Sequence, residues 1–507
     1  MLQNLFLNID MTTVDWSRAQ FALTAIYHWL FVPLTLGLAV IMGIVETKYY
    51  QSRDAFWKTA AMFWQRLFGI NFAMGVATGI ILEFEFGTNW SNYSWFVGDI
   101  FGAPLAIEGI VAFFMESTFV AVMYFGWKKV SPGFHLASTW LTGLGATISA
   151  WWILVANAWM QYPVGCAFNP DTMRNEMVSF AEVALSPFAI SKFCHTVTSS
   201  WIIGAAFCIG VSCWYLLKRR HTRLALESIK IGAGVGLTAA LLAAATGHKS
   251  GMDVAEVQPM KLAAMEALYD GGTEQGLKLI EGVEVPYALS IMATNNPKGY
   301  VPGINDILNG YTTPDGRTEP AIEEKMERGQ KAIQALAAYR QAKATGEDAS
   351  AYLATLNEHI QYFGYGYIKD KNDVVPPVWI TFWSFRIMVA VGCLFIVFFA
   401  VMLAVSYRWP KWLLGKRDIT ALPAWHYVLA ILLIPLAYIG SECGWLVAEF
   451  GRQPWTIQDM LPTWASVSEI QSSSVAITFF IFLFLFTTML AVEISILLKQ
   501  IKKGPEV

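Results

Sequence analysis

Long apolar stretches separated by short polar connections recur along the whole chain of 507 residues. A helix needs about 20 mainly apolar residues to cross a bilayer, and nine stretches approach or exceed that length, the second and sixth being the shortest. The pattern predicts an all-α integral membrane protein with nine transmembrane helices in a bundle. They are centred on Phe21–Val45, Leu67–Leu82, Ala103–Phe125, Leu136–Met160, Phe193–Leu217, Ile231–Ala245, Val378–Ala404, Leu422–Ile439 and Val475–Leu498.

Basic residues gather in alternate connections between these stretches. Of the other connections, Phe84–Gly102 has no Lys or Arg and Trp159–Pro187 has only Arg174. By the positive-inside rule the basic set is cytoplasmic, and an odd number of spans then places the N-terminus outside and the C-terminus inside. The basic set comprises Lys48, Arg53, Lys58, Arg66, Lys128, Lys129, Lys218, Arg219, Arg220, Arg223, Arg408, Lys411, Lys416, Arg417, Lys499, Lys502 and Lys503.

The chain divides into three parts: residues 1–246 with helices one to six, residues 247–377, and residues 378–507 with helices seven to nine. The middle part is charged and falls on the outer side, where long loops cross regardless of their charge. A loop of this length is usually functional or disordered. Its helical periodicity and its YFGYGY run favour an ordered, functional loop, with a plain solvent-exposed spacer as the alternative.

Composition supports a membrane protein. Hydrophobic residues make up 55% and charged residues 14% of the chain, and 33 Phe, 21 Trp and 19 Tyr suit interfacial aromatic belts. A net charge of -3 gives no sign of nucleic-acid binding. The six cysteines form neither a CxxC pair nor a CxxCH motif, which excludes covalent c-type haem attachment.

Two histidines lie inside predicted spans, whereas His135, His221, His248, His359 and His426 are expected in or beside connections. A lone membrane histidine is often a hydrogen-bonded packing residue. His28, about 13 Å along its span, and His195, a turn or two deep, lie at similar depths on separate helices. Because imidazole is the usual ligand of haem iron, the two together favour cofactor ligation.

Further candidate ligands fall in the same outer half of the membrane. Met388 follows Arg386 in the seventh span and is a candidate thioether ligand of a low-spin haem, although most methionines at such positions only fill the core. Glu449 lies near the outer end of the eighth span, a turn before Arg452. An interfacial salt bridge between those two residues is the alternative.

Two carboxylates lie in the third span. Glu108 and Glu116 are separated by about 80° around an ideal helix and by about 12 Å along it. Chains of intramembrane carboxylates are typical of proton relays, with hydrogen-bonded packing residues as the alternative.

Many segments in this chain resemble the signature segments of cytochrome bd oxidase subunit I, in that family's order and from end to end. They are FALTAIYHWLFVPLTLG, FGINFAMGVATGI, EFGTNWSNYS, GDIFGAPLAIEGIVAFFMESTF, WILVANAWMQ, KFCHTV, KLAAMEA, FRIMVA and GWLVAEFGRQPW. The resemblance implies two haem b groups, one low-spin and one high-spin, and one haem d.

The resemblance also implies roles for individual residues. His195 and Met388 would ligate the low-spin haem b, and His28 and Glu449 would each ligate one of the two high-spin haems, in either order. Arg386 and Arg452 would stabilise haems, with Trp445 also at a cofactor. Lys261 and Glu266 in KLAAMEA match quinol-site residues of the outer loop, and Glu108 and Glu116 match proton-path carboxylates.

A terminal oxidase of the bacterial cytoplasmic membrane is the function that this resemblance implies. It would oxidise quinol outside and reduce O2 to water with cytoplasmic protons, generating a proton motive force without pumping. The implied partners are a second membrane subunit, subunit II, in a heterodimer, and a small single-span accessory subunit.

Two other classes compete with this interpretation. A haem b membrane anchor would carry paired histidines on both sides of the membrane, and the candidate ligands here cluster on one side. A solute transporter using His28, Glu108 and Glu116 would show inverted repeats, which the sequence lacks.

Overall fold

The computed structural model describes residues 10–280, 282–407 and 419–505 and is mostly helical. Nine of the helical segments in those residues are long and apolar enough to cross a membrane, which confirms the predicted all-α membrane protein. They are α2 (Met11–Ser52), α3 (Ala55–Thr88), the segment Gly98–Phe125, α7 (Pro132–Gln161), Phe180–Leu217 with α8 (Phe180–Ala184) and α9 (Pro187–Leu217), α10 (Thr222–Val257), Lys371–Tyr407 with η3 (Lys371–Val374) and α16 (Val378–Tyr407), α18 (Ala424–Phe450) and α20 (Ser472–Lys503).

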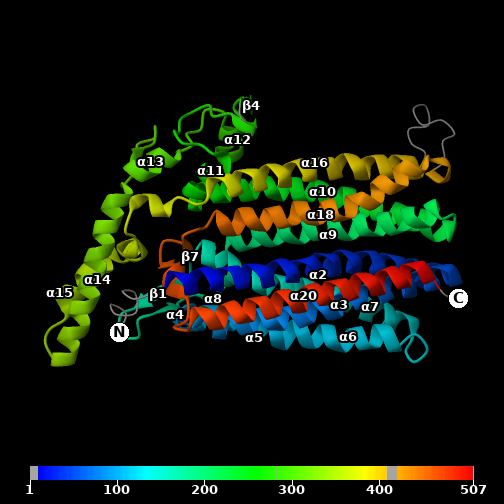
Figure 1. The fold of residues 1–507 in the computed structure, drawn as a ribbon, viewed down its shortest axis with the longest axis horizontal. Coiled ribbons are helices and arrows are strands. Elements are labelled where there is room, and N and C mark those ends of the chain that lie inside the picture. The colour runs from blue at the N-terminus through cyan, green and yellow to red at the C-terminus, as the bar shows by residue number, and fades with distance from the viewer. Residues whose placement is uncertain (1–9, 281, 408–418, 506–507) are drawn as a thin grey trace.

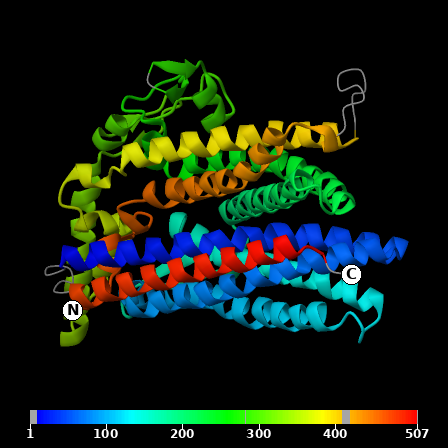
Figure 2. The same cartoon turned by 45° about the vertical axis from the view of Figure 1, so that its right-hand side comes forward.

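These helices run side by side in one bundle (Figures 1 and 2). The helix α2 begins at one end of the bundle and α20 finishes at the other, as an odd number of crossings requires. The helices α2 and α9 cross at a pair of glycines, where a Cβ on Gly37 would lie 2.6 Å from Gly204 Cα. Such small residues let two membrane helices approach closely.

The second and sixth spans are much longer than their apolar stretches. The helix α10 continues to Val257, so His248 lies in a helix and not in the loop where the sequence analysis put it. Its extension packs against α12 (Ala288–Thr294), and Gly251 and Asp253 are buried. The helix ends at Val257 because Pro259 disfavours the α conformation in Gln258, the residue before it.

The third span is not a uniform α-helix. It consists of α5 (Gly98–Ile107), the π-helix η1 (Glu108–Phe113) and α6 (Phe114–Phe125). A π-helix closes its hydrogen bonds from residue i to i+5 and therefore turns less per residue than an α-helix. The predicted 80° between Glu108 and Glu116 assumed an unbroken α-helix and does not apply.

Short elements cover the end of the bundle where α2 begins (Figure 1). In the segment between α10 and α16, α14 (Ile322–Thr345) packs against η2 (Ile360–Tyr367). Tyr339 and Lys343 of α14 each contact Asp171 Oδ1 at 2.9 Å, in the turn between β1 (Cys166–Asn169) and β2 (Arg174–Met177). Each described sheet is an antiparallel pair of strands. The remaining elements are α4 (Ser91–Phe96), β1 (Cys166–Asn169), β2 (Arg174–Met177), α11 (Pro259–Glu266), β3 (Leu277–Ile280), β4 (Val283–Val285), α13 (Ile304–Asn309), β5 (Tyr311–Thr312), β6 (Thr318–Glu319), α14 (Ile322–Thr345), α15 (Ser350–His359), η2 (Ile360–Tyr367), η4 (Ile419–Ala421), β7 (Trp455–Ile457), β8 (Leu461–Pro462) and α19 (Thr463–Ser466).

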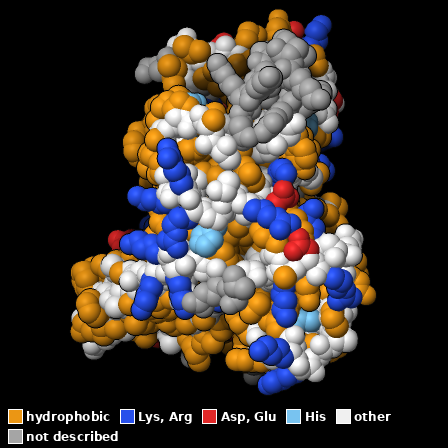
Figure 3. Space-filling model, turned by 90° about the vertical axis from the view of Figure 1, so that its right-hand side faces the viewer, with side chains coloured by type: hydrophobic (Ala, Val, Ile, Leu, Met, Phe, Trp, Pro, Cys, Tyr) orange, Lys and Arg blue, Asp and Glu red, His pale blue; other side chains and the backbone are white. Residues whose placement is uncertain are grey.

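Lys and Arg side chains gather on the opposite end of the bundle, where α2 finishes (Figure 3). The predicted basic residues Arg408, Lys411, Lys416 and Arg417 lie outside the described residues.

Candidate functional site

His195 on α9 is held against α10 by one ring nitrogen. Its Nδ1 lies 3.1 Å from the Ala243 carbonyl oxygen and 3.2 Å from Thr246 Oγ1. The Thr246 hydroxyl already donates to the Leu242 carbonyl at 2.8 Å, so both atoms that face Nδ1 act as acceptors. His195 therefore carries its hydrogen on Nδ1 and keeps a lone pair on Nε2, which is the arrangement of a metal-ligating histidine.

His28 on α2 is held in the same way by α3. Its Nδ1 lies 2.9 Å from Thr78 Oγ1, and that hydroxyl donates to the backbone carbonyls of Met74 and Gly75 at 3.0 and 3.1 Å. Nδ1 must then be the donor, which again leaves Nε2 as a free ligand atom. A Cβ on Gly79 would come within 3.1 Å of the imidazole, so this glycine gives the ring its space.

Met388 on α16 faces α18. If Gly444, one residue before Trp445, carried a Cβ, that atom would lie 3.1 Å from the Met388 sulfur, so the methionine packs directly on this glycine. The indole of Trp445 packs edge-on against Trp29, the neighbour of His28, with 5.1 Å between ring centroids. The structure thus places Met388 against α18, and Trp445 of α18 against the residue that follows His28.

Arg386 and Glu266 form a bidentate ion pair. The guanidinium donates to the two carboxylate oxygens at 3.2 and 2.6 Å, and the residues are only 8% and 1% exposed. Burial raises the pKa of the Glu266 carboxyl above its usual value, although the hydrogen bonds from Arg386 oppose that shift. The structure joins two residues to which the sequence analysis gave separate roles.

Lys261 lies on the same short helix as Glu266 but has different partners. Its Nζ donates at 2.7 Å to both Gln161 Oε1 and Gln258 Oε1. Burial, followed by the positive charge of Lys192, lowers the pKa of Lys261 well below its usual value. The Lys261 amine is thus held by two amide oxygens in a buried site.

Glu449 lies at the centre of a polar network. It accepts a hydrogen bond from Asn157 at 3.1 Å and pairs with Arg452, so the predicted alternative ion pair is present. Asn157 in turn accepts from Lys192 and from Gln161, and Gln161 accepts from Lys261. A continuous polar chain therefore joins Lys261 to Glu449.

Positive charge exceeds negative charge around Glu449. Its carboxylate interacts with the cations of Arg452, Lys192 and Lys261, and Arg452 Nε and Nη1 are buried without a hydrogen-bond partner among the described residues. Such an arrangement fits an additional anionic group, for example the propionate carboxylates of a haem. The residues present therefore suit the cofactor that the sequence analysis assigned to them.

The two carboxylates of the third span face the same side of α7. Ser149 Oγ donates to Glu108 Oε1 at 2.6 Å, and a Cβ on Gly145 would lie 2.6 Å from Glu116 Cγ. Ser149 and Gly145 are four residues apart, one above the other on the helix. Glu108 and Glu116 are thus one turn of α7 apart.

Several polar residues of this region were missed by the sequence analysis. Lys192 is a cation that directly precedes the predicted span Phe193–Leu217, and Asn157 and Gln161 are polar residues four apart at the end of an apolar stretch. Those signals were available in the sequence. His135, expected at a connection, lies inside α7 and is buried.

Comparison with known proteins places these residues in a family. Residues 16–505 match the family model for cytochrome bd terminal oxidase subunit I. The chain is 40% identical to cytochrome bd-II ubiquinol oxidase subunit 1 of Escherichia coli strain K12, over 97% of each chain. It is 34% identical to cytochrome bd ubiquinol oxidase subunit 1 of Bacillus subtilis strain 168, over 98% of this chain and 95% of the relative. A solved structure of bd oxidase from Geobacillus thermodenitrificans has the same fold, with a TM-score of 0.76, 23% identity, and coverage of 97% of this chain and 99% of that one.

Proposed function

Because the chain belongs to the cytochrome bd terminal oxidase subunit I family, we propose that it is the haem-bearing subunit of an enzyme that oxidises quinol and reduces O2 to water. The observation that carries the proposal is the pair His28 and His195. Each lies in a membrane helix, donates Nδ1–H to a neighbouring helix and leaves Nε2 free. Histidines that only packed against neighbouring helices would not both need to keep Nε2 free.

The cofactors of the proposal are two haem b groups and one haem d. His195 and Met388 hold the low-spin haem b, and His28 and Glu449 hold the two high-spin haems, in either order. Arg452 and Trp445 lie beside Glu449 and contribute to the same binding region. When bound, these groups carry electrons and activate oxygen, while the protein sets their ligands and surroundings.

Quinol oxidation is assigned to the buried polar residues Lys261, Glu266 and Arg386. Quinol gives up two electrons and two protons, so the site needs a group that accepts a proton. Glu266 suits that role because its raised pKa lies nearer to neutral pH than that of an ordinary carboxylate. Arg386 positions the carboxylate, and Lys261, with its lowered pKa, hydrogen-bonds a ring oxygen of the quinol.

Protons for oxygen reduction come from the other side of the membrane. Glu116 and Glu108 lie one turn apart along α7, and Ser149 is a hydroxyl beside Glu108 that can both accept and donate. We assign proton delivery to these three residues, from Glu116 to Glu108. Proton release outside and proton consumption from inside then separate charge without a pump.

The chain is a multi-pass protein of the bacterial inner membrane. In the proposal, the basic face (Figure 3) is cytoplasmic, and the segment 247–377 is the quinol-binding loop on the outer side. As a subunit I, the chain is part of an oxidase complex with other subunits. We assign it subunit II as a heterodimeric partner and a small single-span accessory subunit.

Quinol-driven oxygen consumption by the purified complex tests this function. The proposal predicts that O2 uptake depends on added quinol and falls to background in the His195→Ala variant. Haem-containing protein that transfers electrons from quinol to an artificial acceptor but never to O2 would contradict it.

A further inference from the structure

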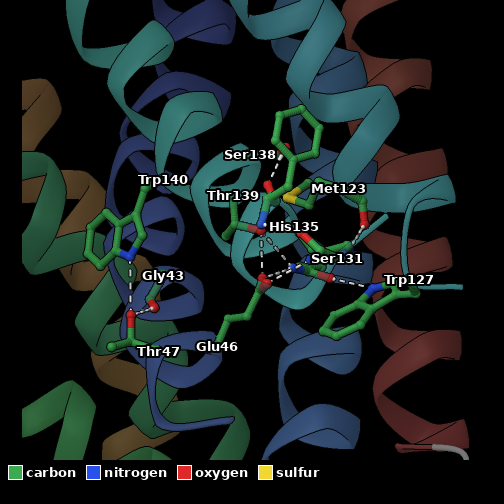
Figure 4. A network of polar contacts seen from close by, with 12 residues as sticks. Gly43, Glu46, Thr47, Met123, Trp127, Ser131, His135, Ser138, Thr139 and Trp140 are labelled. Carbon is green, nitrogen blue, oxygen red and sulfur yellow. Dashed lines mark hydrogen bonds and ion pairs between the residues drawn. The ribbon is translucent and has the colours of Figure 1, made fainter. Parts of the chain in front are cut away.

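A buried polar network joins α2, α3 and α7 near the basic end of the bundle (Figure 4). At its centre, Glu46 Oε1 lies 2.6 Å from His135 Nδ1. Glu46 Oε2 accepts hydrogen bonds from Thr139 Oγ1 at 2.6 Å and Gln65 Nε2 at 2.8 Å. The side chains of His135 and Glu46 are only 3% and 2% exposed, and the proposed function assigns no role to either.

The contact between His135 and Glu46 contains one exchangeable proton. The other ring nitrogen, Nε2, lies 3.0 Å from the Met123 carbonyl oxygen, which can only accept, so Nε2 carries a hydrogen. A second proton must lie between Nδ1 and Oε1, because without it a ring lone pair would face a carboxylate oxygen at 2.6 Å. That proton can belong to either the imidazole or the carboxyl group.

The same face of α7 leads from this pair to the proposed proton path. His135, Thr139 and Thr142 follow one another at spacings of four and three residues and are buried. Gly145, beside Glu116, and Ser149, beside Glu108, continue along the helix. The rise of an α-helix makes the distance from His135 to Ser149 about 21 Å.

We propose that His135 and Glu46 take up protons at the basic end of the bundle and pass them along α7 to Glu116. The inference rests on the proposed proton delivery through Glu116 and Glu108. The hydroxyls of Thr139 and Thr142 lie between the pair and Glu116, and each can accept one proton while donating another. For each proton that leaves the pair, one enters from the cytoplasm, and no electron moves.

Trp127 covers the pair on the side of the connection between α6 and α7. Its ring lies 3.9 Å from the His135 ring, and its Nε1 donates to Gln65 Oε1 at 3.1 Å. Lys58 Nζ lies 5.4 Å from the Trp127 ring centre. The other ionisable groups on the surrounding elements include Lys48, Tyr49 and Tyr50 of α2, Arg66 of α3, Tyr124 of α6, and Lys128 and Lys129 of the connection.

The main alternative is that the network only fastens α7 to α2, and the structure offers a matched control for it. Trp140 Nε1 donates to Thr47 Oγ1 at 3.1 Å, between the same two helices but on their exposed side (Figure 4). Trp140→Phe removes an inter-helix hydrogen bond without touching a titratable group.

The test uses the complete oxidase complex in vesicles, with Glu46→Gln, Glu46→Asp and Trp140→Phe. Glutamine keeps the size of Glu46: its oxygen can accept from Thr139 and Gln65, and its NH2 group can donate to His135 Nδ1, but it cannot bind the proton. We expect normal haem content and normal anaerobic reduction of the haems by quinol in Glu46→Gln. Proton uptake after an oxygen pulse, and turnover with it, should fall about tenfold or more. Glu46→Asp should recover part of the rate, and Trp140→Phe should behave as the wild type.

Wild-type turnover and proton uptake in Glu46→Gln, together with slow turnover in Glu116→Gln, would overturn this inference and leave the proposed function intact. Normal rates in both variants would also remove the proposed path through Glu116. Loss of haem in both Glu46→Gln and Trp140→Phe would show a structural role and overturn the inference.

If Glu46→Gln does not assemble, Thr142→Val provides the second test. Within the described part of the chain, the Thr142 hydroxyl donates only to the Ser138 carbonyl of its own helix, at 2.9 Å, so its removal leaves no described side chain unpaired. Slow proton uptake in Thr142→Val supports the route, and an unchanged rate overturns it.

Discussion

Arg386 of α16 donates two hydrogen bonds to Glu266 of α11, joining residues that are 120 positions apart in the chain. The pair links the proposed quinol site to the helix that carries Met388, two residues after Arg386. A buried ion pair contributes little net stability, because removing two charges from water opposes their attraction. The ion pair instead fixes positions, since it holds the carboxylate that we propose as proton acceptor near a candidate haem ligand.

Replacing Arg386 by Met should destabilise the folded complex by about 3–5 kcal/mol, because Glu266 would remain buried and unpaired. Adding Glu266→Gln should restore most of the stability without restoring quinol oxidation. Thermal unfolding of the single and double variants measures this coupling. Equal losses of stability in the two variants would contradict it.

Glu266→Gln should lower quinol turnover by about 10²-fold or more, the usual contribution of a general base. In the wild type, kcat/KM for quinol should rise with pH through a value above 4.5, because the carboxyl must be ionised to accept a proton and its pKa is raised. In the Glu266→Gln variant, this rise of kcat/KM with pH, the acidic limb of the profile, should disappear. A pH profile that keeps the same limb in Glu266→Gln would assign the titration to another group.

The raised pKa of Glu266 also has a consequence for stability. Between pH 4.5 and the raised value, the folded chain binds more protons than the unfolded chain, so the stability contributed by this group is lost as pH rises. Relative to Glu266→Gln, the wild type should therefore lose unfolding free energy on going from acidic to neutral pH. Thermal unfolding of both proteins across that interval measures the difference, and the opposite slope would contradict it.

His195→Ala should abolish the low-spin haem signal, whereas His248→Ala should leave it unchanged. His248 is a suitable control because it also lies on the outer part of the bundle, where its Nε2 contacts Asn295 Oδ1 at 2.9 Å. The optical spectrum of each purified variant distinguishes them. A normal low-spin signal without His195 would exclude this residue as a ligand.

Gly145→Ala should slow turnover without removing the haems, because the new Cβ would lie 2.6 Å from Glu116 Cγ and displace that side chain. Gly102→Ala in α5 is the matched control, since a Cβ there has open space. Oxygen consumption per haem compares the two. Equal rates would show that the position of Glu116 does not matter for turnover.

The membrane helices were the most predictable part of the fold. Hydropathy reports which residues can enter lipid, so Ile231–Ala245 was detected, but the continuation of α10 to Val257 depends on packing against α12 outside the apolar stretch. The π-helix at Glu108–Phe113 cannot be predicted from the spacing of apolar residues. Only the structure shows that it changes the direction of Glu116 around the helix axis relative to Glu108.

For the site, residue types within spans identified the histidines and carboxylates, but not their partners. The pairing of Arg386 with Glu266, and the approach of Lys261 to Gln161, both bring together distant parts of the chain. Such tertiary contacts cannot be inferred from spacing along one helix. Glu46 and His135 lie just beyond the ends of two predicted spans, and only the fold shows that they meet.

The most direct test of the central claim is the dithionite-reduced minus air-oxidised optical spectrum of the purified complex. The account predicts a chlorin band together with low-spin and high-spin haem b signals, as ligation through His195, Met388, His28 and Glu449 requires. A spectrum with low-spin haem b alone, or with no haem, would contradict it.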